Sequence, residues 1–123
     1  IDVYVKALRA TERARVPQKT SGKEELYMTI EYKNYAKCLK VLSDETRLEI
    51  MDLLSEGEMC ACALLDQFSI TQPTLSYHMK MMKDCGLVDS RKDGIWVKYS
   101  VNHEKLDELK DFFQTMAKQN TTV

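Results

Sequence analysis

The stretch TQPTLSYHMKMMKDCG, residues 71–86, decides the fold that this sequence predicts. Within it, Leu75, Met79 and Met82 recur at the three- and four-residue spacing that gives a helix one buried face. Thr71 is suited to cap the first turn, and Gly86 ends the run. The outward side chains are mostly short or hydrogen-bonding groups, of the kind that read base edges and phosphates.

Three more helices are predicted before this one. The apolar segment 62–68 and the connection 69–71 form, with the helix that follows, a helix, a tight turn and a helix. Further upstream, one helix is expected from Thr29 to about Leu42, and another from a cap at Ser43 to Gly57. Within that second helix Leu48 and Leu54 are expected to be buried. The buried stripe of the Thr29 helix is predicted to be Tyr32, Tyr35, Ala36, Leu39 and Leu42.

A hairpin and a last helix complete the predicted domain. Residues 87–99 read as two alternating strands around Asp93-Gly94, a strong hairpin signal. Arg91 and Lys92 make the tip of this hairpin basic, and Asn102 is suited to cap a final helix. The apolar stripe predicted for that helix belongs either to the core or to a dimer interface, and it consists of Leu106, Leu109, Phe112, Phe113 and Met116.

A helix-turn-helix followed by a basic hairpin is the winged form of a DNA-binding motif. The predicted fold is therefore α+β, mainly α: a winged helix-turn-helix with a two-stranded wing and flanking dimerisation helices. Since one recognition helix contacts only a half-site, the expected partners are operator double-stranded DNA and a second copy of the chain. The residues predicted to contact DNA are Gln72, Thr74, Ser76, Tyr77, His78, Lys80, Arg91 and Lys92. The dimer interface is predicted to include Leu39, Leu106, Leu109 and Phe113.

Length and charge set limits on these expectations. The chain has 123 residues, with 18 basic against 19 acidic side chains, so bulk charge does not drive nucleic-acid binding, although a local basic face remains open. The length suits one domain, predicted at 28–118, and the absence of a long apolar run predicts a cytoplasmic protein that does not bind membranes. Residues 1–27 are predicted to be a disordered extension and 119–123 a tail. The codons of Lys23-Glu24-Glu25 can spell a ribosome-binding sequence, so translation from Met28 is one hypothesis for the extension; a native arm or a tag remnant is the alternative.

Several motifs, in order along the chain, resemble one family. They are LSDETRLEI (42–50), EMCAC (58–62), TQPTLSYH (71–78), GLV (86–88) and GIWVKY (94–99). Together they closely resemble the ArsR/SmtB family of metal-responsive repressors over residues 29 to about 116. The resemblance implies a homodimeric repressor that binds its operator without inducer and leaves it when a metal or metalloid binds.

The resemblance also implies an inducer site. A Cys-x-Cys at the start of the first helix of the helix-turn-helix, here Cys60 and Cys62, is similar to the family's arsenic, antimony, cadmium or lead sites. Arsenite or antimonite is the expected inducer, with no organic cofactor, because soft sulfur suits a soft ion and a helix N-terminus favours thiolates. Residues two apart on a regular helix point to nearly opposite sides, so both sulfurs can hold one ion only if Cys60 is extended or the first turn deforms.

A third ligand is not readable from the sequence. Leu65 occupies the position of a third cysteine in one common arsenic pattern, so Cys38, Cys85, a partner-subunit thiol or a small cellular thiol are the candidates. Cys38 and Cys85 lie among apolar helix positions and are expected mainly as core residues. Cadmium- and lead-responsive members draw cysteines from an N-terminal arm, and residues 1–37 contain none.

Three alternatives remain open at this point. Within the same fold, Cys60 and Cys62 could respond to oxidation, or to cadmium or lead. From another class, a small thiol oxidoreductase would use the same cysteines, but no Cys-x-x-Cys lies in a strand-helix-strand pattern, and an enzyme is not expected. A winged-helix interaction module that senses nothing is the third alternative.

Overall fold

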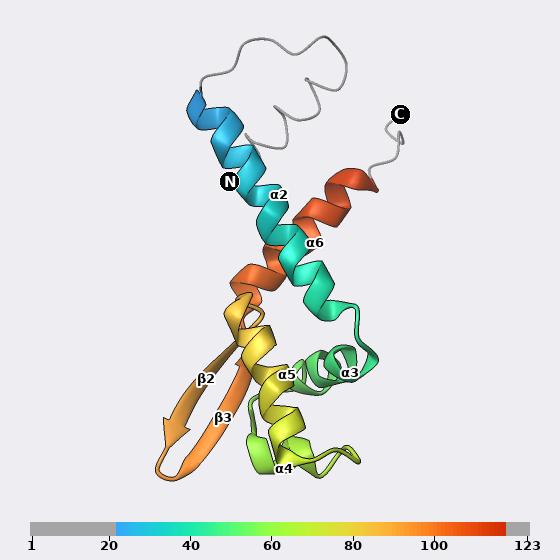
Figure 1. Ribbon diagram of the computed structural model, residues 1–123, viewed down its shortest axis with the longest axis vertical. Coiled ribbons are helices and arrows are strands. Elements are labelled where there is room, and N and C mark those ends of the chain that lie inside the picture. The colour runs from blue at the N-terminus through green and yellow to red at the C-terminus, as the bar shows by residue number, and fades with distance from the viewer. Residues whose placement is uncertain (1–21, 118–123) are drawn as a thin grey trace.

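The computed structural model describes the backbone of residues 22–117 and the side chains of residues 31–117. Five helices and a small antiparallel sheet make up this part of the chain (Figure 1). The elements are α2 (Gly22–Leu42), α3 (Glu45–Leu54), β1 (Met59–Cys60), α4 (Ala61–Leu65), α5 (Gln72–Asp84), β2 (Val88–Asp93), β3 (Trp96–Val101) and α6 (His103–Met116). The predicted winged helix-turn-helix is confirmed, with α4 and α5 as its two helices and β2 and β3 as its wing. None of the described helices is long and apolar enough to cross a membrane.

The first described helix extends beyond the boundary predicted after residue 27. Helix α2 begins at Gly22, because Lys23-Glu24-Glu25-Leu26 are good helix formers that continue the helix toward the N-terminus. The rest of the predicted extension, the proposed tail at 119–123 and residue 118 lie outside the described residues.

Local signals set the ends of the helices around the turn. Thr71 caps α5 by accepting a hydrogen bond from the Thr74 backbone N–H at 3.3 Å, as predicted. The predicted Asn102 cap of α6 is also confirmed, with its side chain accepting from Lys105 N at 3.2 Å. The cap of α3 is Asp44 and not Ser43, since the Asp44 carboxylate accepts the Arg47 N–H at 3.0 Å.

The core lies between the five helices α2 to α6 and the base of the wing. The predicted inner face of α5 is confirmed, since Leu75, Met79 and Met82 are buried. On α2 the predicted stripe is only partly right: Tyr35 is buried, but Tyr32 and Leu39 are exposed. The buried face of α2 is turned toward Tyr35, Cys38 and Val41.

The sheet has one strand more than predicted. Its order is β1-β3-β2, and the two residues of β1 pair with the centre of β3 through Met59 with Tyr99 and Cys60 with Lys98. The tight turn between β2 and β3 depends on Gly94, whose φ of +66° is a conformation that side chains disfavour. The strand β1 therefore joins the start of α4 directly to the wing.

Candidate thiol site and nucleic-acid interface

Cys60 and Cys62 lie together at the start of α4. Cys60 is the residue before the helix, and its φ of −77° and ψ of 157° are those of an extended chain. Its Sγ lies 2.7 Å from the Cys62 Sγ and accepts a hydrogen bond from the Ala63 N–H at 3.4 Å. Because Cys60 is extended, the sulfurs of two residues only two positions apart lie on one side of the chain. This is the condition stated above for both sulfurs to bind one ion.

The contact between the two thiols moves their pKa values in opposite directions. The hydrogen bond from Cys62, followed by that from the Ala63 N–H, lowers the pKa of Cys60. The same bond to Cys60, then desolvation and the Cys60 charge, raises the pKa of Cys62. Cys60 is therefore the first of the pair to ionise, and as a thiolate at a helix N-terminus it is a soft nucleophile.

The pair is not part of a larger cluster of metal-binding side chains in the described part of the chain. Among the described residues, no group of three or more His, Cys, Asp or Glu side chains is arranged to hold a metal ion. Cys38 and Cys85 are both buried in the core and are hydrogen-bonded there to the backbone. The donor set at this site is thus two thiols, which suits a soft, thiophilic ligand.

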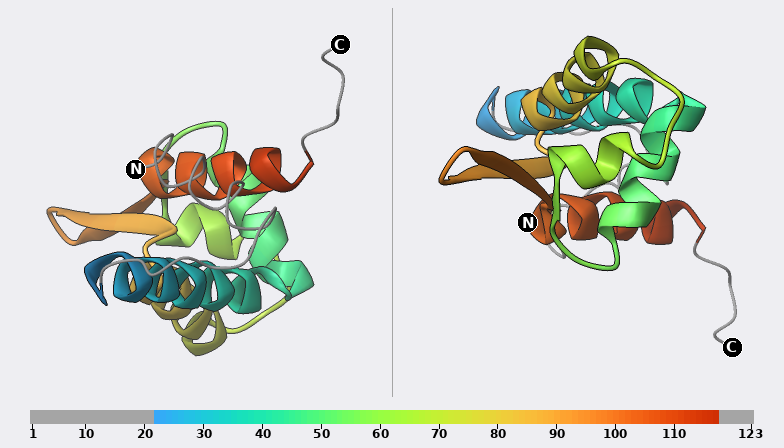
Figure 2. Two further views of the ribbon diagram at one scale, coloured as in Figure 1. Left: turned by 90° about the horizontal axis from the view of Figure 1, so that it is seen from above. Right: turned by 90° about the horizontal axis from the view of Figure 1, so that it is seen from below.

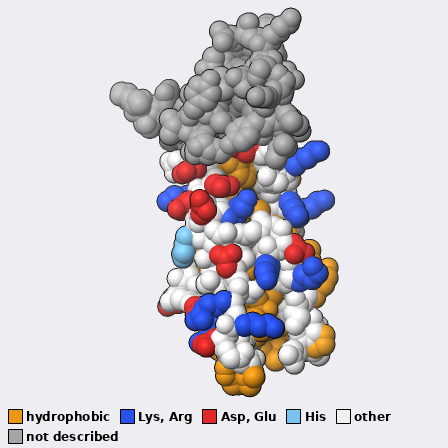
Figure 3. All heavy atoms as spheres, turned by 90° about the vertical axis from the view of Figure 1, so that its left-hand side faces the viewer, with side chains coloured by type: hydrophobic (Ala, Val, Ile, Leu, Met, Phe, Trp, Pro, Cys, Tyr) orange, Lys and Arg blue, Asp and Glu red, His pale blue; other side chains and the backbone are white. Residues whose placement is uncertain are grey.

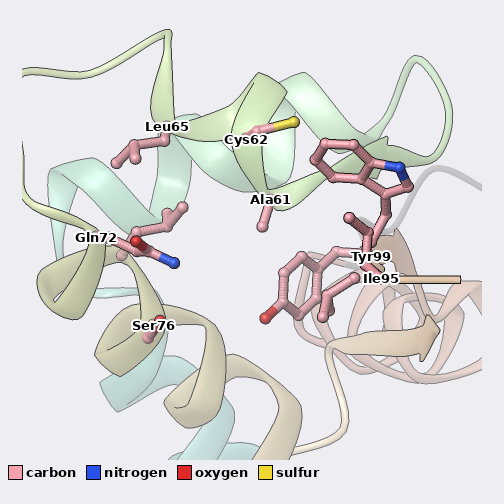
Figure 4. A pocket seen from close by; sticks show the side chains of 10 residues that line it. Ala61, Cys62, Leu65, Gln72, Ser76, Ile95 and Tyr99 are labelled. Carbon is pink, nitrogen blue, oxygen red and sulfur yellow. The ribbon is translucent and has the colours of Figure 1, made fainter. Parts of the chain in front are cut away.

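A cavity of about 270 Å³ adjoins the thiol site. Figure 4 shows Cys62 and Leu65 on α4, Ser76 on α5, and Tyr99 on the wing around it, with the Tyr99 ring pointing inward. Desolvation raises the pKa of this tyrosine. The sequence did not single out Tyr99 as a site residue; it lies on β3, where it pairs with Met59 of β1.

The wing is tied to the chain next to Cys60. Arg91 on β2 donates two hydrogen bonds to the Glu58 carboxylate, at 2.7 Å and 2.8 Å. This contact lowers the pKa of Glu58 and raises that of Arg91. In register across the sheet, Cys60 pairs with Lys98, and Lys98 pairs with Arg91. Arg91, which is predicted to contact DNA, is also part of this Glu58–Arg91 clamp, and sequence alone did not reveal Glu58 as its partner.

The predicted DNA-reading residues of α5 are mostly accessible. Gln72, Thr74, Ser76, Tyr77 and Lys80 are exposed, and Lys80 forms an ion pair with Asp84 at 3.1 Å.

His78 is different from the other predicted reading residues. It is half-buried, and its Nδ1 lies 2.9 Å from Nη1 of Arg47 on α3. Since the guanidinium can only donate, Nδ1 of His78 is the acceptor. His78 therefore links α3 to α5, and its contact with DNA stays a prediction.

The wing side of the molecule carries basic and apolar groups together. Figure 3 shows Lys and Arg side chains on this face beside acidic ones, with hydrophobic side chains at its lower end. At the tip of the hairpin Lys92 is exposed, Ile95 is 87% exposed and Trp96 is also exposed. A tip with this mixture suits contact with a phosphate backbone and the groove beside it.

A second surface lies where α2 and α6 cross (Figures 1 and 2). Tyr35 of α2 and Phe112 of α6 stack at 4.5 Å between ring centres. Beside them, an apolar groove of about 500 Å³ is lined by Leu106 and Phe113, with Leu109 among its lining residues. Phe113 is exposed and Leu106 half-buried, but Leu109 is only 2% exposed and belongs to the core of this chain. Of the predicted interface residues, Leu109 therefore has almost no surface to offer a partner.

Solved structures define the class of protein first. An ArsR-like transcriptional regulator from Rhodococcus sp. RHA1 superposes with a TM-score of 0.64 and 26% identity, covering 71% of this chain and 82% of that one. The homodimeric winged helix-turn-helix DNA-binding domain of a Mycobacterium bovis protein gives a TM-score of 0.62 and 26% identity, covering 83% of this chain and 90% of the other. The fold is that of a winged helix-turn-helix regulator.

Sequence relatives then identify the family. The model of the bacterial regulatory protein, arsR family, matches residues 44–90. The arsenical resistance operon repressor of Staphylococcus aureus is 55% identical over 78 residues, which are 63% of this chain and 75% of that protein. The chain belongs to the ArsR family of transcriptional regulators, and it is not an enzyme.

Proposed function

We propose that this protein is a homodimeric repressor of arsenical resistance genes, which binds operator DNA and is released by arsenite or antimonite held at Cys60 and Cys62. The observation that carries the proposal is the 2.7 Å contact between the two sulfurs where β1 passes into α4. The name and the 55% identity of the staphylococcal arsenical resistance operon repressor support an arsenic-type inducer. Thiolate sulfur is also the donor that such a soft ion prefers.

The third donor to a three-coordinate ligand comes from outside this chain's cysteines. Of the four cysteines, Cys38 and Cys85 are buried and bonded within the core. A thiol of the partner subunit or a small cellular thiol remains to fill this position, on the exposed side of Cys62.

Ligand binding acts on both DNA-contacting elements at once. The first turn of α4 leads through a short connection to α5, and β1 is hydrogen-bonded to β3 of the wing. An ion held by both sulfurs would change and fix the placement of Cys60 relative to Cys62, and with it the placement of β1 relative to the start of α4. The recognition helix and the wing then lose the relative placement that the operator requires.

Fluorescence anisotropy on a palindromic fragment from the protein's own promoter tests this function. The protein is bound to the fragment under reducing conditions and is then titrated separately with arsenite, antimonite, cadmium, lead, zinc and hydrogen peroxide. Release by arsenite or antimonite at the lowest concentrations supports the proposal. Release only by peroxide favours a redox regulator, release only by cadmium or lead favours another soft-metal regulator, and absence of binding refutes a repressor.

The Glu58–Arg91 clamp leads to a prediction about DNA affinity. Replacing Glu58 with Gln removes the carboxylate that neutralises Arg91 and frees a wing cation for phosphate. We expect tighter binding in low salt, and a plot of log K against log salt that is steeper by about 0.9, the value for one added phosphate contact. Anisotropy titrations at four salt concentrations measure both.

Glu56→Gln is the matched control for this prediction. Glu56 is also exposed and carries the same charge, but Arg91 binds Glu58 and not Glu56. Equal slopes in the two variants would mean that net charge, and not the release of Arg91, sets the affinity.

The groove between α2 and α6 is the proposed dimer interface. It is apolar, and Leu39, Leu106 and Phe113 lie on the two helices that bound this surface. Phe113→Glu places a charge on the seam, and we expect the dimer dissociation constant to rise at least about 100-fold, because an interfacial charge without a partner costs several kcal/mol. Light scattering across a dilution series measures the change. Ile95→Glu, at the exposed wing tip, is expected to remain dimeric, and a monomeric Ile95 variant would contradict the assignment.

A further inference from the structure

Cys38 and Cys85 form a second pair of thiols, within the core. Cys38 lies on α2, and Cys85 is the residue that ends α5. The Cys38 Sγ donates a hydrogen bond to the Cys85 backbone oxygen at 3.3 Å, and the Cys85 Sγ donates to the Met82 oxygen at 3.4 Å. Both thiols are therefore held where α2 meets the end of α5.

The two cysteines also shift each other's acidity. The interaction with the Cys38 thiol lowers the pKa of Cys85 to about 7. The same interaction, together with burial, raises the pKa of Cys38. Cys85 is therefore the thiol that ionises first, and its thiolate forms near a Cys38 thiol that stays protonated, which is the arrangement that precedes disulfide formation.

The surroundings of Cys85 favour an attack that begins there. The Lys37 ammonium lies 3.5 Å from the Asp84 backbone oxygen, and its charge lowers the pKa of both thiols. The Lys105 side chain packs over Gly86, the residue after Cys85. Its Cε lies 3.1 Å from the position that a Cβ would have at Gly86. Cys85 is 7% exposed and Cys38 only 1%, so a small oxidant reaches Cys85 first.

We propose that Cys38 and Cys85 are a peroxide-oxidisable dithiol, and that their disulfide ties α2 to the end of α5 and changes the affinity for operator DNA. The Cys85 thiolate attacks one oxygen of hydrogen peroxide; the O–O bond breaks, an S–OH group forms, and the departing hydroxide takes a proton to become water. The Cys38 sulfur then attacks the Cys85 sulfur; the S–S bond forms, the S–O bond breaks, and this hydroxide takes the Cys38 proton to become a second water. The pair loses two electrons and the peroxide gains them.

The disulfide joins an element of the proposed dimer interface to the recognition helix. Helix α2 carries the exposed Leu39, and α5 carries the exposed side chains that face DNA in the proposed function. A disulfide between Cys38 and Cys85 restricts the motion of α5 relative to α2. The effect on DNA rests on the proposed function, whereas the disulfide itself does not.

The test uses the folded Cys60→Ser/Cys62→Ser double variant, whose only cysteines are Cys38 and Cys85. After treatment with hydrogen peroxide we expect the intact mass to fall by about 2 Da, the mass of the two hydrogens lost. Peptide mapping is expected to find Cys38 linked to Cys85, and dithiothreitol to reverse the link. Between the oxidised and reduced forms of this same variant, we expect operator affinity to differ by at least about threefold.

A triple variant with Cys38→Ala as well is the control, and it is expected to gain oxygen at Cys85 without losing 2 Da. In the double variant, oxygen gain without a cross-link, no reaction at all, or a cross-link with unchanged affinity would each overturn the switch. If the reduced protein does not bind operator DNA, both the proposed function and the predicted change in affinity are refuted. The mass measurement then still decides whether the two cysteines are an oxidisable pair.

Discussion

Replacing either Cys60 or Cys62 with serine is expected to abolish the release of the protein from its operator by arsenite. Each thiol provides one of the two sulfurs at the site, and they lie 2.7 Å apart. Removing a residue that only orients an ion-binding side chain already weakens ion affinity by about 10- to 100-fold, and removing an ion-binding thiol itself costs at least as much. We therefore expect the arsenite concentration for half-release to rise at least about 100-fold. Anisotropy of the protein on its operator measures this. The affinity without arsenite is expected to stay within about twofold, because neither thiol is on the exposed face of α5.

Ala61→Ser is the matched control for the cysteine variants. Ala61 stands between the two cysteines in the same turn, and the substitution introduces the same hydroxyl group while leaving both thiols in place. Its response to arsenite is expected to remain near that of the unchanged protein. A cysteine variant that keeps its response, or that loses DNA binding before arsenite is added, would contradict a purely sensory role for the pair.

The second large effect is expected on stability. Leu64 in α4 has no exposed surface and belongs to the core. Its replacement by alanine leaves a cavity beneath a helix of only five residues, and we expect the free energy of unfolding to fall by about 3 kcal/mol. Urea unfolding followed by circular dichroism measures the loss, at one fixed protein concentration because a dimer's stability depends on it.

Leu48→Ala provides the comparison for Leu64. It removes the same atoms from a side chain that is 52% exposed on α3, and a loss of less than about 1 kcal/mol is expected. Similar losses in the two variants would mean that α4 does not pack as the structure describes.

The features predicted correctly from the sequence depend on neighbours along the chain. Thr71 and Asn102 cap helices through residues three positions later, and the inner face of α5 follows from a regular spacing. Capping and helical periodicity are local, so a single sequence contains them in full.

The features that the sequence did not predict depend on contacts between distant residues. The strand β1 has two residues and exists only because it pairs with β3. Arg91 lies 33 positions from Glu58, and His78 lies 31 from Arg47.

The same limit explains one error of burial and one question that the sequence leaves open. Leu48 was expected inside and is exposed. The sequence leaves the apolar stripe of α6 open between core and dimer interface, and Leu109 on this stripe is buried. The spacing of apolar residues identifies the apolar face of a helix. Which residues of that face are buried within the same chain depends on how helices distant in the sequence pack against it.

The position of Arg47 has a consequence for the length of the operator. Its Nε donates to the Val41 oxygen of α2 at 2.6 Å, and its Nη1 contacts His78 of α5 at 2.9 Å. One rigid guanidinium thus joins the helix of the proposed dimer seam to the recognition helix, and no flexible linker separates them. In such a dimer the separation of the two recognition helices is built into the fold. One base pair inserted between the half-sites moves them by about 3.4 Å and turns them by about 34°, a change that this frame cannot absorb, so the regulator selects its sites by spacing as well as by bases.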